Sequence, residues 1–275
     1  MQHFERGGYV FDVRDGGDPS APAVILLHGF PEDGGAWDEV ALQLQQAGYR
    51  TLAPDMRGVS PGARPRSSVE YRIAESVHDT VALLDAAGLE RAHIVGHDWG
   101  GAVAWAMAGE ESDRMLTLTA VSTPHPLAVV GSMVRSTQAL QSWYMALFQL
   151  PYLPEALLTP GRPMWRAMVR GLPREDVARY SERMSDRAAR SAALGWYRMI
   201  PREVAAPSVP WSPVSVPTLY VWGDRDPALG RAAAEGTADY VTGPYRFEVV
   251  RAGHWIPETR PVLLAALLID HLGSV

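Results

Sequence analysis

The chain has 275 residues, which is enough to bury a large core and suits one sizeable domain with an inserted lid. Its formal net charge is −6, from 31 acidic residues and 25 basic residues that are all arginine, and this mixture argues against a basic face for nucleic acid or anionic membranes. Cysteine is absent, so disulfides and thiolate metal ligands are excluded.

The N-terminal stretch MQHFERGGYV is charged and rich in glycine, unlike a signal peptide, which has a basic start followed by an apolar run. The longest apolar runs, such as LLAALLI near the C-terminus, are much shorter than the ~18 residues of a membrane-spanning helix. We therefore expect a cytoplasmic protein that acts on a small molecule.

In chain order, short apolar runs bounded by turn residues alternate with segments of helical periodicity. The strand-like runs are 9–13, 23–29, 51–55, 92–98, 116–122, 218–224 and 246–250. Helical patterns at 36–48 and 69–88 separate the earlier runs, and each ends at a glycine. Strands separated by helices predict a mostly parallel sheet that is covered by helices on both faces.

This alternation stops in the region 126–213. The region has no strand-like run and carries Trp, Met, Leu and Arg at helical spacing, as in PLAVVGSMVRSTQALQSWYMALFQ. We interpret it as a helical cap inserted into the sheet domain. The predicted organisation is therefore a core in two parts, 1–125 and 214–275, with the cap at 126–213.

The stretch VGHDWGG at 95–101 has glycines on both sides of a central residue, as in the nucleophile elbow of hydrolases, but Asp98 stands where a serine is expected. The stretch lies between a strand-like run and a helical pattern, which is the context that this turn requires. Gly96 and Gly100 permit close approach of the backbone, and the positive end of the helix that begins near Trp99 faces the carboxylate. A helix cap without a catalytic role is the alternative, because aspartate is common there.

The ends of other strands supply groups that can act with Asp98. The segment LLHGFPE follows an apolar run and places the Phe30 amide where it can join the Trp99 amide as an oxyanion hole. The segment YVWGDRDPALG ends a later strand and offers Asp226, and VVRAGHWIPE ends the next strand and offers His254. In folds with this elbow, the chain order is nucleophile, then acid, then base, which these residues follow.

Together these motifs resemble the epoxide hydrolases of the α/β-hydrolase fold. The resemblance spans essentially the full length, through HGFPE, DMRGVSPGARP, GHDWGG, STPHP, GDRDPALG and AGHW, and the cap adds SWYMALFQLP and LGWYR. It implies an α/β-hydrolase fold, in which a mostly parallel sheet carries an inserted helical cap, and it implies no cofactor and no metal. One departure is RGVS, since the family usually has an aromatic residue at the Val59 position.

The resemblance assigns Asp98 as the nucleophile, His254 as the base and Asp226 as the acid that orients the base. Asp224 is a rival for the acid, and only the match of GDRDP to the family pattern favours Asp226.

The resemblance also implies that Tyr144 and Tyr197 of the cap hold the epoxide oxygen, whereas periodicity alone favours ordinary aromatic packing. Aromatic side chains are expected to contact the substrate, namely Phe30, Trp99, Trp143 and Trp196. The histidines near the motifs are expected to be structural, namely His28, His97 and His125.

A carboxylate with a reference pKa of ~3.9 is ionised at neutral pH and needs no base in order to attack. Its attack on a saturated carbon gives an ester of Asp98, which water must then hydrolyse with His254 as the base. A tyrosine with a pKa of ~10 stays protonated and can donate to the oxygen of an opening epoxide. The predicted reaction is therefore hydrolysis of an apolar epoxide to a vicinal diol.

Two other functions fit the same motifs. A haloalkane dehalogenase uses N–H donors to cradle a halide, from the Trp after the nucleophile and from either an Asn after HG or a cap Trp. Phe30 stands at that Asn position and the chain has no asparagine, so a cap tryptophan is required. The candidates for it are Trp143, Trp165, Trp196 and Trp211. A non-catalytic ligand-binding protein is the second alternative, because a fold does not fix a function.

The expected partners are an epoxide and water, with a homodimer as the one assembly considered. Neither nucleic acid nor a membrane is expected as a partner.

Overall fold

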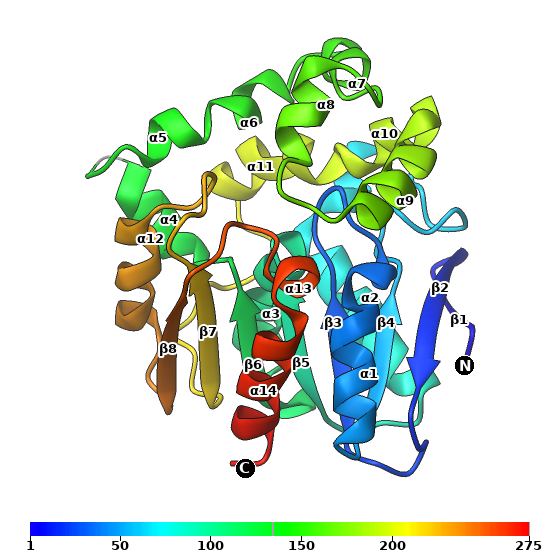
Figure 1. The fold of residues 1–275 in the computed structure, drawn as a ribbon, viewed down its shortest axis with the longest axis vertical. Helices are drawn as coiled ribbons and strands as arrows, with labels where there is room; N and C mark the ends of the chain where they lie inside the picture. The colour runs from blue at the N-terminus through cyan, green and yellow to red at the C-terminus, as the bar shows by residue number, and fades with distance from the viewer. Residues whose placement is uncertain (134, 275) are drawn as a thin grey trace.

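The computed structural model describes residues 1–133 and 135–274, and its centre is an eight-stranded β-sheet (Figure 1). In spatial order the strands are β1 (His3–Arg6), β2 (Tyr9–Gly16), β4 (Arg50–Pro54), β3 (Ala23–Leu27), β5 (Ala92–His97), β6 (Met115–Val121), β7 (Thr218–Gly223) and β8 (Tyr245–Val250). The pairs from β4 to β8 are parallel, whereas β1 and β2 are antiparallel at one edge. The predicted mostly parallel sheet is therefore confirmed.

The hairpin at the N-terminal edge includes a strand, β1, that is not evident from the sequence pattern. Gly7 and Gly8 join β1 to β2, and both have positive φ angles, 60° and 82°, as a type I′ hairpin turn requires. β1 has only 4 residues, so it offers too few alternations for a strand pattern to be recognised.

The two faces of the sheet bury separate hydrophobic clusters. Along β3, Val24 and Leu26 belong to one cluster, and Ile25 and Leu27 belong to the other. Successive side chains of a strand point to opposite faces, and both faces here are covered, so the whole strand is apolar.

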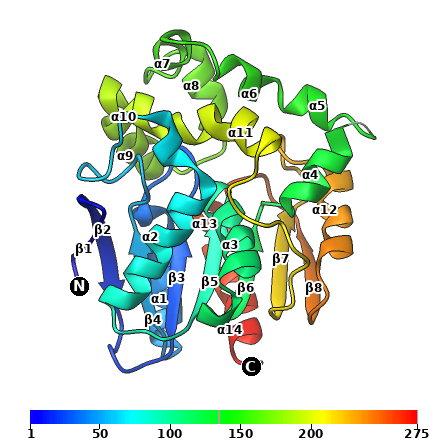
Figure 2. The same ribbon diagram turned by 180° about the vertical axis from the view of Figure 1, so that it is seen from behind.

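Helices cover both faces of the sheet, as predicted. α1 (Asp38–Gln46) and α14 (Pro261–Leu272) lie over the face of Val24 and Leu26, and the opposite face is covered by α2 (Ile73–Ala86) and α3 (Trp99–Glu110) (Figures 1 and 2). The remaining core helices are α12 (Arg231–Gly236), α13 (Ile256–Thr259), and the 3₁₀ helices η1 (Gly34–Trp37), η2 (Ser68–Tyr71), η3 (Ser112–Arg114) and η4 (Thr237–Tyr240). Within the described residues, no helix is long and apolar enough to cross a bilayer.

The helices between β6 and β7 lie beyond the carboxyl ends of the strands (Figure 1). They are α4 (Pro126–Met133), α5 (Gln138–Gln141), α6 (Trp143–Leu147), α7 (Leu153–Leu157), α8 (Pro163–Met168), α9 (Arg174–Ser185), α10 (Arg187–Ala193) and α11 (Gly195–Ala205). α5 to α11 form a layer across the top of the sheet, whereas α4 lies lower and packs against α12 of the core. The cap boundaries at 126 and 213 stay a prediction, and residue 134 lies outside the described residues.

Because β3, β5, β7 and β8 run in the same direction, their carboxyl ends meet at one edge of the sheet, beneath this layer. The loops that follow these strands carry Phe30, Asp98, Asp226 and His254. Four segments that are far apart in the chain are therefore brought to one place, and this edge is where ligands bind in α/β folds.

Candidate active site

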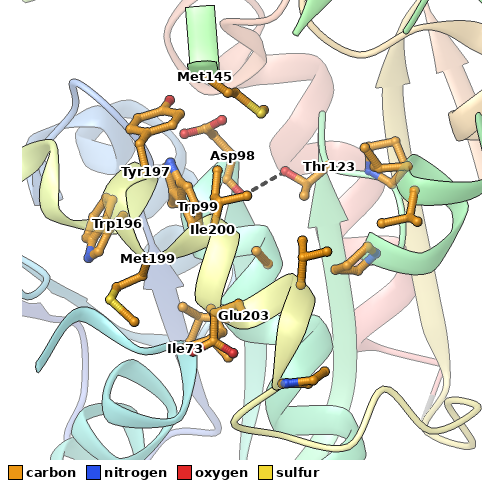
Figure 3. A pocket seen from close by; sticks show the side chains of 18 of the residues that line it. Ile73, Asp98, Trp99, Thr123, Met145, Trp196, Tyr197, Met199, Ile200 and Glu203 are labelled. Carbon is orange, nitrogen blue, oxygen red and sulfur yellow. Dashed lines mark hydrogen bonds between the residues drawn. The ribbon is translucent and has the colours of Figure 1, made fainter. Parts of the chain in front are cut away.

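Asp98 lies in a strained turn between β5 and α3. Its backbone has φ 50° and ψ −118°, a combination that residues other than glycine rarely adopt. A Cβ on Gly96 would lie 2.1 Å from the Gly100 oxygen, and a Cβ on Gly29 would lie 2.3 Å from the Asp98 Cβ, so the turn requires these glycines. The Thr123 hydroxyl donates to the Asp98 carbonyl oxygen at 2.8 Å (Figure 3). Asp98 occupies the N-cap position of α3, but its side chain makes no cap hydrogen bond to the helix, so capping does not account for the carboxylate.

His254 lies between two carboxylates. Its Nδ1 is 2.7 Å from Asp226 Oδ2, and its Nε2 is 3.4 Å from Asp98 Oδ2. Asp226 is buried, and its Oδ1 accepts hydrogen bonds from the amides of Ala228 and Leu229 at 2.8 and 3.1 Å. These amides fix the carboxylate against Nδ1, which in turn orients Nε2 toward Asp98.

Asp224, the rival for the acid, is exposed to solvent. The backbone turns between the two aspartates, where the Asp226 amide donates to the Gly223 oxygen at 3.1 Å. This turn carries Asp226 inward and leaves Asp224 outside, so the structure brings only Asp226 to His254.

The Phe30 amide donates to Asp98 Oδ1 at 2.9 Å. Trp99 is the first residue of α3, so its amide has no carbonyl partner within the helix. Within the described residues, no hydrogen bond joins the Trp99 amide to the Asp98 side chain. Of the two predicted donors, only Phe30 is therefore engaged, and it leaves Oδ2 on the side of His254.

The charges of this cluster depend on one another. Burial alone would raise the pKa of Asp98, but the hydrogen bond and charge of His254 hold that pKa below its usual value. Burial alone would lower the pKa of His254, but Asp226, and then Asp98, raise it well above its usual value. Asp98 is therefore ionised at neutral pH, and its charge helps His254 to keep a proton.

We expect Asp98→Asn to lower the pKa of His254, because one of the two carboxylates that raise it loses its charge while its shape is kept. A titration of the imidazole signal by NMR measures this shift. Asp224→Asn, which changes an exposed carboxylate nearby, should leave the His254 pKa unchanged. Equal pKa values in the native and Asp98→Asn proteins would mean that the charge of Asp98 does not act on the imidazole.

Tyr144 on α6 and Tyr197 on α11 approach the site from the cap. Their ring centroids are 6.0 Å apart, and the Tyr197 ring makes an edge contact with Trp99 at 5.2 Å. Burial raises the pKa of both phenols, and the negative charge of Asp98 raises each pKa further. Both hydroxyls therefore stay protonated at neutral pH and lie within the electrostatic field of the carboxylate.

A cavity of about 360 Å³ holds Asp98 and both tyrosines in its wall. Most of the wall is apolar and comes from α4, α11 and the start of α2, with side chains such as Leu127, Val130, Met133, Ile73, Met199 and Ile200. Figure 3 shows Asp98 and Tyr197 toward one end, with Ile73 and Glu203 toward the other. The Glu203 carboxylate forms an ion pair with Arg72 at 3.3 Å, so the negative charge at that end of the cavity is balanced by a positive one.

The structure brings Trp99 and Trp196 to this cavity, but it corrects two other predicted substrate contacts. Trp143 is 61% exposed and lies outside the described lining residues, because it and Tyr144 are neighbours on a helix and face different directions. The ring of Phe30 also lies outside the lining residues and packs against Tyr197 at 5.2 Å. Phe30 therefore acts at the site through its amide.

Glu32 and His97 form a buried pair, in which His97 has the structural role expected of it and Glu32 is a partner that the sequence did not indicate. Glu32 Oε1 is 2.7 Å from His97 Nδ1, and both side chains are 0% exposed. Glu32 Oε2 accepts from the Gly29 amide at 2.6 Å, and His97 Nε2 is 2.9 Å from the His254 carbonyl oxygen. The pair thus links the loop after β3, the last residue of β5 and the loop after β8, and His97 precedes Asp98 directly in the chain. The available signal was the position of both residues inside the HGFPE and GHDWGG motifs.

The other two histidines near the motifs serve packing. His28 Nε2 accepts from the Met56 amide at 2.9 Å, and the His125 ring stacks on Tyr240 with centroids 4.7 Å apart. Among residues 1–133 and 135–274, no group of three or more His, Asp or Glu side chains is arranged to hold a metal ion.

Comparisons with known proteins identify the family to which this fold belongs. The alpha/beta hydrolase fold family matches residues 22–261. The chain is 33% identical to the AB hydrolase superfamily protein YfhM of Bacillus subtilis, over 99% of this chain and 98% of that protein. It is also 33% identical to epoxide hydrolase A of Mycobacterium tuberculosis, over 98% of this chain and 96% of that protein. The crystal structure of epoxide hydrolase A from Mycobacterium thermoresistibile superimposes with a TM-score of 0.85 at 29% identity, covering 98% of this chain and 97% of that one. The chain therefore belongs to the alpha/beta hydrolase fold family and, within it, to the epoxide hydrolase family.

Proposed function

We propose that the protein hydrolyses an apolar epoxide to a vicinal diol through a covalent ester on Asp98, with water activated by His254 and Asp226. One observation carries this proposal: two protonated phenols and an ionised carboxylate share one apolar cavity. Opening an epoxide needs both kinds of group, a nucleophile for the carbon and an acid for the oxygen.

In the first half-reaction, Asp98 Oδ2 attacks a ring carbon, because Oδ1 is held by the Phe30 amide. The bond from Oδ2 to carbon forms as the ring carbon–oxygen bond breaks. The electron pair moves to the ring oxygen, which takes a proton from Tyr144 or Tyr197 while the other phenol donates a hydrogen bond to it. The product is an ester of Asp98 with one free hydroxyl.

In the second half-reaction, His254 takes a proton from water, and the water oxygen attacks the Asp98 carbonyl carbon. Negative charge develops on Oδ1, where the Phe30 amide already donates. The Trp99 amide, which has no carbonyl partner within α3, is the second N–H that we propose to donate once this charge forms. The tetrahedral intermediate collapses, and the diol leaves with Oδ2 and takes the proton from His254. The re-formed Asp98 carboxyl gives up its remaining water-derived proton, which returns to the phenolate left by the first half-reaction. The ester has removed the charge of Asp98, which lowers the His254 pKa and makes the imidazole available as a base.

The apolar wall of the cavity favours apolar substituents on the epoxide. Burying such a substituent contributes roughly 25 cal/mol per Å² of apolar surface, whereas a charged substituent would lose its hydration without an opposite charge beside it. An aryl or alkyl epoxide, such as styrene oxide, is therefore the substrate class that we propose.

A dehalogenase on the same frame would instead need N–H donors from the cap around a departing halide. The indole nitrogen of Trp196 lies on the side of its ring away from Asp98 (Figure 3). The cap groups whose pKa is raised by the charge of Asp98 are the phenols of Tyr144 and Tyr197. These donors favour an epoxide oxygen as the leaving group, and parallel assays of diol formation and halide release distinguish the two reactions.

The covalent route predicts where the oxygen atoms go in a single turnover with excess enzyme in heavy-oxygen water. The diol should be unlabelled, because its new oxygen comes from Asp98, and the label should appear in the peptide that contains Asp98. Mass spectrometry of the diol and of that peptide measures both. A fully labelled first-turnover diol would show that Asp98 acts as a base for water and would overturn the covalent mechanism.

A further inference from the structure

The turn from Gly29 to Glu32 carries the Phe30 amide, and its backbone is held from the core side. Gly29 donates to the Glu32 carboxylate at 2.6 Å, and the Glu32 amide donates to the Gly29 oxygen at 3.1 Å. His28 Nδ1 lies 2.8 Å from the same Gly29 oxygen. The carbonyls of Pro31 and Glu32, by contrast, accept hydrogen bonds from the cap.

Arg183 of α9 meets those two carbonyls. Its guanidinium donates to the Pro31 oxygen, to the Glu32 oxygen at 2.8 Å, and to Asp33 Oδ2 at 2.5 Å. The Arg183 side chain is only 14% exposed, so these bonds are largely shielded from water. A planar guanidinium with five N–H groups can make all three contacts at once, which a single ammonium does poorly.

Arg179 lies one helical turn earlier on α9 and offers a natural comparison. Its guanidinium pairs with Asp33 Oδ1 at 3.0 Å and with Asp176 at 2.7 Å, so it too joins the cap to the loop after β3. Among the described hydrogen bonds it makes none to the carbonyls of Pro31 or Glu32. The two arginines share the same cap-to-core ion pair but differ in their contact with the turn.

We propose that Arg183 is a positioning residue for the oxyanion hole, because it fixes the turn that aims the Phe30 amide at Asp98 Oδ1. The Phe30 amide and the Pro31 carbonyl belong to adjacent residues of the same short turn, so a shift of that carbonyl should move the donor and lengthen its 2.9 Å hydrogen bond. The packing of the cap on the core thereby also sets the position of the oxyanion donor. This inference rests on the proposed covalent mechanism, in which charge develops on Oδ1.

The two half-reactions depend on this donor differently. During hydrolysis of the ester, Oδ1 gains a full negative charge, and the Phe30 amide stabilises it directly. During attack on the epoxide, the carboxylate loses charge, so the amide contributes little to that step. Loss of the Arg183 contacts should therefore slow hydrolysis of the ester much more than its formation.

The test compares Arg183→Gln with Arg179→Gln in single-turnover experiments with styrene oxide, in which rapid quenching and intact-protein mass spectrometry follow ester formation and decay. Loss of a well-placed oxyanion donor costs about 10²–10³-fold, and a misaligned donor should cost part of this, so we expect Arg183→Gln to slow ester decay by roughly 10–100-fold. Ester formation should change by less than about threefold, because it needs little help from the donor. Arg179→Gln should leave both steps within about threefold, and Arg183→Lys should recover part of the decay rate.

The inference is overturned if Arg183→Gln and Arg179→Gln behave alike, or if Arg183→Gln slows ester formation as much as decay with a raised KM. Either result would mean that Arg183 only holds the cap in place. If Arg183→Gln does not fold, Arg183→Lys decides the question, and ester decay at the native rate in that variant contradicts the proposal. If the native protein opens the epoxide without forming an ester, the proposed covalent mechanism itself fails, which is a different result from equal decay rates among the variants.

Discussion

Replacing His254 with glutamine is expected to leave the protein able to open one epoxide ring and unable to release the diol. A carboxylate needs no base in order to attack, and the Phe30 amide still holds the Asp98 pKa down when the charge of His254 is lost, so attack on the ring carbon should survive the change. Hydrolysis of the ester loses its general base, and steady-state turnover should fall on the order of 10²–10⁴-fold. Intact-protein mass spectrometry should then find the protein heavier by one molecule of substrate.

His78→Gln is the matched control, since that imidazole is 42% exposed and lies on α2, outside the cavity. It should turn over normally and accumulate no adduct. If the His254→Gln protein is folded, forms no adduct and opens no epoxide, then His254 is needed for the attack itself, and the assigned separation of roles is wrong.

Replacing both Tyr144 and Tyr197 with phenylalanine should nearly eliminate ring opening, while either change alone should weaken it. The ring oxygen takes its proton from one phenol and a hydrogen bond from the other, so a single phenol can still serve as the acid. Loss of the pair should cost on the order of 10²–10⁴-fold in the rate of ester formation. Only two hydroxyls are removed, so the midpoint of thermal unfolding should change little.

Tyr152→Phe provides the control for the tyrosines, because its side chain is 71% exposed on the cap and lies outside the cavity. Its rate of ester formation should match that of the native protein. Near-normal epoxide turnover in a folded Tyr144→Phe, Tyr197→Phe protein would remove the phenols from the mechanism and reopen the question of the leaving group.

The sequence could predict the elbow and the sheet because the constraints that produce them are short in range. Gly96 is required by the backbone of Gly100, only four positions away, so the cause of this requirement lies within the motif itself. The alternation of buried strands and helices likewise follows from local periodicity. Asp98, Asp226 and His254 each follow a strand. Because the carboxyl ends of parallel strands meet at one edge of the sheet, these residues could be expected to lie close together.

The sequence could not predict which way a side chain faces on a short helix. α6 has only 5 residues, so no hydrophobic period defines its inner face, and the packing of the cap decides that Tyr144 lines the cavity while Trp143 is exposed. The choice between Asp226 and Asp224 was of the same kind, because a single turn of backbone separates the buried carboxylate from the exposed one.

Local patterns in the sequence determined by themselves that a carboxylate stands in a strained turn at the edge of a parallel sheet, with a histidine and a second carboxylate on later loops. Only the tertiary structure decided how that turn is supported. Arg183 lies 152 positions from Pro31, and Glu32 reaches His97 across another loop. Contacts between such distant segments depend on how the whole cap packs on the sheet. The free energy of that packing is shared among many residues, so no short sequence motif predicts these contacts.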